Sequence, residues 1–68
     1  MKNEGGETMT LKEARLNARY TQKEAARLLG VSVPTLWNWE NGTSEPNVTA
    51  FRKMCELYQV KSDAIFMP

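Results

Sequence analysis

The sequence of 68 residues contains no histidine and only one cysteine, Cys55. A single cysteine cannot form an internal disulfide, which excludes the disulfide-rich secreted class and suits a reducing cytoplasm. The lack of histidine removes the usual zinc ligand and the base of a Ser-His or Cys-His nucleophile pair. We therefore predict no catalytic residues, no metal, no cofactor and no enzymatic activity, and we interpret Cys55 as a small buried hydrophobic residue.

Long hydrophobic runs and a strong excess of one charge are also missing. No apolar run approaches the roughly 20 residues that span a bilayer, and the N-terminal segment MKNEGGETM lacks the apolar stretch of a signal peptide. Nine Lys and Arg residues against eight Asp and Glu residues give a net charge of +1, which argues only weakly for a polyanionic partner. Since 68 residues cannot hold two domains, we expect a single domain. The lack of an apolar run and of a signal peptide leads us to expect that it is cytoplasmic and not associated with a membrane.

The chain divides into a short polar segment and one helical domain. Residues 1–8 carry two glycines and no apolar pattern after Met1, so we expect a flexible tail there and a folded domain over residues 9–68. No stretch alternates long enough between apolar and polar residues to predict a β-strand.

Two capping boxes of the type S/T-x-x-E predict the starts of the first two helices. Thr10 with Glu13 predicts a helix from near residue 10 to about residue 19 or 20. Thr21 with Glu24 predicts a second helix over 22–29, which Gly30 ends in a left-handed conformation.

Three further caps predict the remaining helices. Ser32 precedes a proline that a first helical turn tolerates, so a helix is expected over 33–40. Asn47 and an amphipathic stripe predict a helix over 48–58, and Ser62 predicts a short fifth helix over about 63–66. The predicted fold class is therefore all-α, with five short helices.

Residues 21–42 carry the most specific motif in the chain. The dipeptide TQ at 21–22, the turn LGVS at 29–32 and the segment WENG at 39–42 occur together, with a small residue, Ala26, where two helices would cross. In this combination the chain resembles the phage-repressor (Cro/XRE-like) helix-turn-helix family over about residues 10–66. The resemblance implies a repressor-like fold that binds double-stranded DNA sequence-specifically, as a small, repressor-like transcriptional regulator of bacterial or phage origin. Helix 33–40 would then read the major groove.

The resemblance and the helical spacing together select candidate DNA contacts. In the family, the glutamine at the position of Gln22 contacts a DNA phosphate through its amide. Four residues of helix 33–40 share its outer face, and among them Asn38 can pair bidentately with adenine while Val33 can touch a thymine methyl group. The candidate DNA-binding residues are Gln22, Lys23, Ser32, Val33, Pro34, Thr35, Trp37, Asn38 and Asn41.

Several of these residues have a structural alternative. Gln22 could be a surface residue near a helix cap, and Asn38 an asparagine near a helix end. Trp37 could pack along its own helix against Val33, although a large exposed aromatic residue usually marks a contact surface.

The resemblance also implies an ion pair that supports the recognition helix. In the family, an arginine of the first helix pairs with the glutamate that ends the recognition helix, and Arg15 and Glu40 match these positions. The pair would be partly buried and would fix helix 33–40 against the first helix. The alternative is that both are independent surface charges. Leu36 and Trp39 lie off the outer face and are predicted to point toward the core.

The charge distribution departs from what a DNA-binding helix would favour. Residues 31–45 contain no Lys or Arg and have a net charge of −2, against +2 for residues 1–30 and +1 for residues 46–68. The frequent contact of arginine with guanine is therefore missing from helix 33–40. Attraction to phosphates must come from the amides of Gln22 and Asn41, from helix N-termini, and from four cations, Lys12, Arg19, Lys23 and Arg27. The alternative function is a protein–protein interaction module that keeps the repressor-like fold without binding DNA.

A second copy of the chain is the other expected partner. One helix-turn-helix reads few base pairs, so we expect a weak homodimer on a two-fold site, with half-sites about one helical turn apart. Apolar residues near the C-terminus, Ile65, Phe66 and Met67, are the candidate dimer surface. No effector domain is evident, so we expect no small-molecule ligand.

Overall fold

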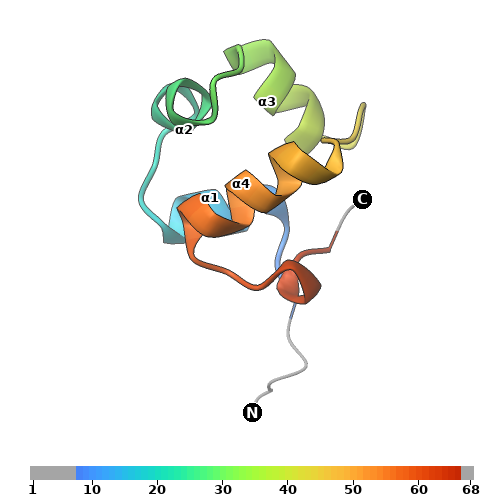
Figure 1. Ribbon diagram of the computed structural model, residues 1–68. Coiled ribbons are helices and arrows are strands. Elements are labelled where there is room, and N and C mark those ends of the chain that lie inside the picture. The colour runs from blue at the N-terminus through green and yellow to red at the C-terminus, as the bar shows by residue number, and fades with distance from the viewer. Residues whose placement is uncertain (1–7, 67–68) are drawn as a thin grey trace.

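The computed structural model describes residues 8–66. Four α-helices follow one another along this part of the chain: α1 (Leu11–Asn17), α2 (Gln22–Leu29), α3 (Val33–Glu40) and α4 (Val48–Tyr58). A 3₁₀ helix, Ser62–Ala64, comes last. Figure 1 shows α2 and α3 crossing at one end of the molecule, with α1 and α4 crossing beside them. The predicted flexible tail lies outside the described residues except for Thr8.

The side-chain caps set the starts of the four α-helices where the sequence predicts them. Thr10 and Thr21 each accept a hydrogen bond from the backbone N–H of the glutamate three residues on, and each glutamate bonds back to the cap backbone. Ser32 caps α3 through Thr35 N–H, and Asn47 caps α4 through Ala50 N–H. Gly30 ends α2 at φ 75°, where a residue with a Cβ would be strained.

The core lies between the four helices and combines small and aliphatic side chains with two large aromatic ones, Trp39 and Tyr58. Ala25 and Ala26 of α2 are buried, so the helices of the motif approach closely. Leu36 and Trp39 of α3 are buried too, as predicted from their place off its outer face. The remaining buried core residues are Leu11, Ala14, Leu29, Met54 and Tyr58. Cys55 is buried beside them, and burial raises the pKa of its thiol.

The prediction of a fifth α-helix is wrong. Residues 62–64 form only one 3₁₀ turn, and Ile65 is already extended. The reason is a pairing across the chain: the N–H of Met9 donates to the carbonyl of Ala64 at 2.9 Å, and the N–H of Phe66 donates to the carbonyl of Met9 at 2.8 Å. This short parallel bridge uses the backbone groups that a helix would need.

The first helix ends earlier than predicted. Asn17 is its last residue, and Arg19 adopts a left-handed conformation with φ 69°. The N–H of Arg19 donates to the carbonyl of Leu16 at 3.0 Å, and the N–H of Tyr20 donates to the carbonyl of Arg15 at 3.2 Å. This pair of bonds is the Schellman ending of a helix, in which the left-handed position is usually glycine.

Candidate nucleic-acid interface

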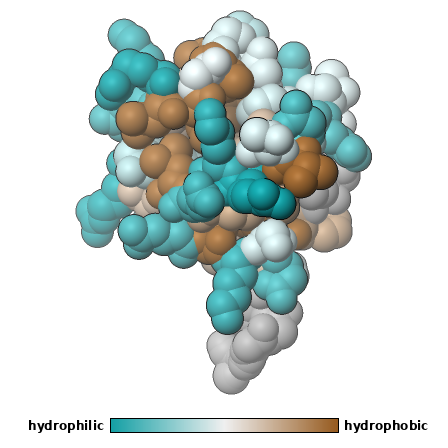
Figure 2. Space-filling view, in the orientation of Figure 1, coloured by the Kyte–Doolittle hydropathy of each residue, from teal (hydrophilic) through white to brown (hydrophobic). Residues whose placement is uncertain are grey.

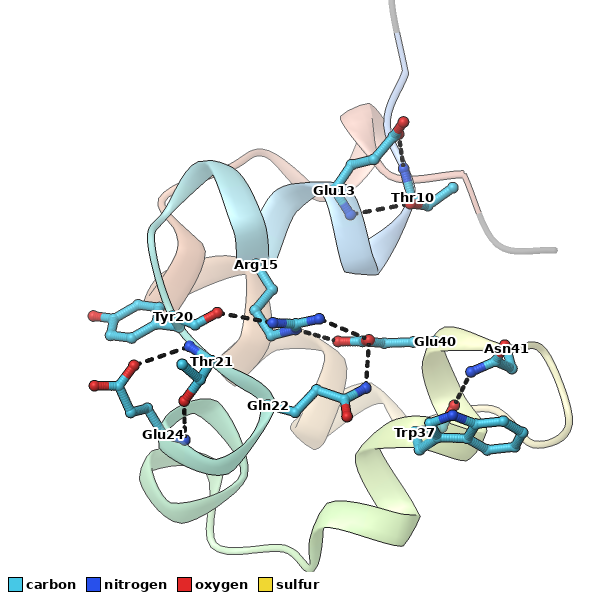
Figure 3. Close-up of polar contacts among 10 residues, drawn as sticks. All are labelled: Thr10, Glu13, Arg15, Tyr20, Thr21, Gln22, Glu24, Trp37, Glu40 and Asn41. Carbon is cyan, nitrogen blue, oxygen red and sulfur yellow. Dashed lines mark hydrogen bonds and ion pairs between the residues drawn. The ribbon is translucent and has the colours of Figure 1, made fainter.

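A buried polar cluster ties α3 to the first two helices (Figure 3). Arg15 Nε donates to Glu40 Oε2 at 2.7 Å, and a second guanidinium nitrogen lies 3.3 Å from Glu40 Oε1. The third nitrogen donates to the carbonyl of Tyr20 at 2.8 Å. The two charged side chains are only 6% and 1% exposed. The predicted ion pair is therefore present and buried, and the two residues are not independent surface charges.

Gln22 belongs to the same cluster. Its amide nitrogen donates to Glu40 Oε1 at 3.0 Å, so the side chain turns inward from the start of α2 toward the end of α3 (Figure 3). This bond was not predicted from the sequence, which indicated either a contact with a DNA phosphate or a surface position near a helix cap for Gln22. One of the two amide hydrogens is used by Glu40, and the other is left for an external acceptor. The side chain is half-buried, so it is not simply a surface residue.

The outer face of α3 is exposed and mostly apolar. Trp37 is 49% exposed and Val33 is 38% exposed, and Pro34 next to Val33 is exposed as well. Asn38 is half-buried, with its backbone carbonyl accepting from the N–H groups of Thr43 and Ser44. In Figure 2, hydrophobic residues reach the surface over the α2 and α3 end of the molecule, between hydrophilic side chains.

The polar candidates at the two ends of α3 already make local hydrogen bonds. The hydroxyls of Ser32 and Thr35 lie 2.9 Å apart, and Ser32 also accepts from the N–H of Thr35. Asn41 donates through its side-chain amide to the carbonyl of Trp37 at 2.8 Å (Figure 3). These bonds hold the side chains in place, and each keeps further donor or acceptor capacity for an outside group.

Burial of Glu40 changes the charge at the interface. Of the two acidic residues in segment 31–45, Glu40 is neutralised by Arg15 inside the protein and only Glu45 is exposed. Lys12 and Arg19 of the α1 region, and Lys23 and Arg27 of α2, are all exposed. Burial of the pair removes one charge of each sign from the surface and leaves Glu45 as the exposed acidic residue of segment 31–45.

An open cleft of about 610 Å³ lies between α1, the start of α2 and α3. Some of its lining residues are predicted DNA contacts, and the others are not. Gln22 and Trp37 are the two candidate DNA contacts that the fold brings to it, whereas Lys23, Asn38 and Asn41 are not part of its lining. The full lining is Lys12, Arg15, Leu16, Arg19, Tyr20, Thr21, Gln22 and Trp37.

Tyr58 has an unusual environment but does not face the cleft. Its hydroxyl is buried and has no hydrogen-bond partner among the described residues. Burial first, and the carboxylate of Glu40 second, raise the pKa of Tyr58 to about 12.

Within residues 8–66, no three His, Cys, Asp or Glu residues gather as a possible metal site. No helix in that range has the length and apolar character needed to cross a membrane.

Comparison with known proteins identifies the arrangement. The helix-turn-helix family matches residues 11–65, from the start of α1 to the residue after the 3₁₀ turn. The chain belongs to this helix-turn-helix family. The family predicted from TQ, LGVS and WENG is thereby confirmed.

A curated relative agrees with the family. Over 53 residues the chain is 43% identical to the HTH-type transcriptional regulator ImmR of Bacillus subtilis (strain 168). The matched segment covers 78% of this chain and 42% of the relative, so the chain spans about two-fifths of the relative's length. No solved structure matches the chain significantly.

Proposed function

We propose that this helix-turn-helix chain is a sequence-specific double-stranded DNA-binding protein that regulates transcription in the cytoplasm of a bacterium or its phage. Helix α3 enters the major groove with its outer face toward the bases. We assign no catalytic activity, cofactor or small-molecule ligand to it.

One observation carries the proposal: the outer face of α3 is exposed, while its inner face is held by core packing and by hydrogen bonds to α1 and α2. Leu36 and Trp39 anchor α3 in the core, and Glu40 is held by Arg15 and Gln22. A helix fixed in this way presents its outer residues without further ordering, which lowers the entropy lost on binding. Asn38 and Val33 are the proposed base contacts on this face, an amide for adenine and an apolar group for a thymine methyl.

Contacts with the DNA backbone would position α3 in the groove. Gln22 keeps one amide hydrogen for a phosphate, and Lys23 is exposed one residue further along α2. Ser32 and Asn41 cap the two ends of α3, and Thr35 lies in its first turn. These groups fix register and orientation but carry no base preference themselves.

We further propose that two chains bind one two-fold DNA site. The half-sites would lie roughly 34 Å apart, one helical turn. Of the predicted dimer residues, Phe66 is 57% exposed, whereas Ile65 is half-buried and packs against the core. Met67 lies outside the described residues. Phe66 is thus the better-placed residue for the contact.

Selection from random duplex DNA tests the proposal. We expect an enriched motif for the parent protein. Asn38→Ala should bind the selected site roughly 5- to 150-fold more weakly, the equivalent of about 1–3 kcal/mol, and should lose preference at one base pair. Asn17→Ala is the matched control, because Asn17 is an exposed asparagine at the end of α1, away from α3. Failure to enrich any motif, or unchanged preference in Asn38→Ala, would contradict base reading by α3.

A further inference from the structure

The dipeptide Asn41-Gly42 lies at the end of α3 and on the surface. Both residues are exposed, Asn41 is the C-cap of α3, and Gly42 is in the left-handed conformation at φ 75°. Because glycine has no side chain, nothing on its own Cα shields its backbone nitrogen. The other asparagines of the described residues are followed by residues that carry a side chain: Asn17 by Ala, Asn38 by Trp and Asn47 by Val.

An asparagine that precedes glycine is chemically labile. The backbone nitrogen of Gly42, after giving its proton to hydroxide, would attack Cγ of Asn41 and close a succinimide ring, while the side-chain nitrogen takes up a proton and leaves as ammonia. Water then opens the ring at either carbonyl, which gives aspartate or isoaspartate. The reaction needs only water and hydroxide, and its net result is a carboxylate in place of a neutral amide.

The end of α3 holds the two reacting atoms apart. Asn41 has ψ 3°, at which the nitrogen of Gly42 points toward the backbone nitrogen of Asn41 and not toward its Cβ, so ring closure requires a large rotation about this bond. The side-chain amide of Asn41 is held by the carbonyl of Trp37 at 2.8 Å. The N–H of Gly42 makes only a long bond of 3.4 Å to the carbonyl of Trp39. A long bond at an exposed helix end opens readily, so ring closure should follow fraying of this last turn.

A carboxylate at position 41 is unfavourable both in the fold and beside DNA. It cannot donate a hydrogen bond, so the bond to the carbonyl of Trp37 is lost and two oxygens face each other. It also adds negative charge at the C-terminal end of α3, where the helix dipole is already negative. In the proposed complex Asn41 contacts the DNA backbone, and a carboxylate there would repel phosphate.

We propose that Asn41 is a site of spontaneous deamidation, opened by fraying of the last turn of α3, and that its acidic products weaken DNA binding. The effect on binding rests on the proposed function, whereas the reaction itself is a property of the free chain. The two halves of the inference are therefore tested separately.

Peptide mass spectrometry of protein aged at mildly alkaline pH tests the reaction. One tryptic peptide, residues 28–52, contains Asn38, Asn41 and Asn47, so the three rates are compared within one molecule. We expect conversion to be fastest at Asn41, and faster in urea than in buffer because urea opens the turn. Asn41→Gln should stay unconverted at this position, since its ring would need six atoms instead of five. Equal conversion at the three asparagines would overturn the site, and a rate in urea no higher than in buffer would overturn the role of fraying.

DNA titration tests the effect of the product. Asn41→Asp should bind the selected duplex roughly eightfold more weakly than the parent at 0.1 M salt, about the effect of one phosphate contact. The deamidated fraction of aged parent protein, separated by ion exchange, should show the same loss. Asn17→Asp is the matched control, because it adds the same charge at the exposed last residue of α1, away from α3, and should keep the parent's affinity.

The outcomes of the two tests separate this inference from the proposed function. If Asn41→Asp and the deamidated fraction both bind as tightly as the parent, the effect on binding is overturned while the proposed function stands. If the parent protein binds no duplex, the proposed function and the effect on binding fail together. Conversion at Asn41, measured by mass, decides the chemical half in either case.

Discussion

Arg15→Ala tests whether the buried cluster holds α3 in place. The substitution removes three hydrogen bonds: two to the carboxylate of Glu40 and one to the carbonyl of Tyr20. Glu40 would keep only the amide of Gln22 as a partner, at a site where its side chain is 1% exposed. A buried charge that loses its counterion is costly because neither solvent nor a partner compensates it.

The expected loss is large relative to the stability of so small a protein. Removing one partner of a buried pair costs about 3–5 kcal/mol. A chain of 68 residues has a free energy of unfolding of about 3–10 kcal/mol at typical values per residue. We therefore expect Arg15→Ala to be unfolded or only marginally folded at 25 °C.

Urea denaturation followed by tryptophan fluorescence measures this loss, since Trp39 is buried in the folded state. Arg52→Ala is the matched control, because it removes an exposed arginine from α4 and should change the free energy of unfolding by less than about 0.5 kcal/mol. The double variant Arg15→Met with Glu40→Met should be more stable than Arg15→Ala, since it leaves no unpaired buried charge. A loss below about 1 kcal/mol in Arg15→Ala, the range of solvated pairs, would refute the reasoning.

Three further predictions concern other parts of the molecule. Tyr58→Phe removes a buried hydroxyl without a partner, so it should change the free energy of unfolding by less than about 1 kcal/mol. The pKa of Tyr58 is about 12 in the folded state, above its value in the unfolded state, so the parent should lose stability as pH rises from about 10 toward 12. Thermal melts should show a smaller loss of stability over this pH range for Tyr58→Phe. Gly30→Ala should destabilise by about 1 kcal/mol through backbone strain alone, since no atom lies within 4 Å of the added Cβ; a melting temperature equal to the parent's would contradict this. Sedimentation of the DNA complex should give two chains per selected site, and one chain at saturation would refute the two-fold arrangement.

Local chemistry explains why most helix boundaries could be predicted. The bounds of α2, α3 and α4 follow from caps and helix-ending residues within a few positions of each other, and Gly30 marks the turn. The fifth helix could not be judged in this way. Whether residues 63–66 form a helix depends on Met9, which lies more than fifty residues earlier in the chain. The backbone of Met9 pairs with that of Ala64 and Phe66. Local capping preference at Ser62 was outweighed by this distant pairing.

The same contrast applies to the candidate interface. Spacing within α3 was enough to predict which residues face outward and which face the core. The bond from Gln22 to Glu40 joins residues 18 positions apart, and no short motif reports it. Arg19 was predicted to end a helix and to attract phosphates, but its left-handed conformation and its place in the cleft depend on how α1 ends and packs.

Burial of one carboxylate also changes how the charge of the chain should be interpreted. Counted along the sequence, segment 31–45 is acidic, which favours an interaction module over a DNA-binding domain. In the fold, Glu40 faces inward and is neutralised by Arg15, so Glu45 is the exposed acidic residue of that segment. The exposed cations of α1 and α2 are accompanied by two exposed acidic residues, Glu13 and Glu24. A DNA strand responds to the potential at the surface and not to the composition of a segment. The acidic count therefore gives no ground to prefer an interaction module, and the electrostatic argument for DNA depends on exposed Lys12, Arg19, Lys23 and Arg27.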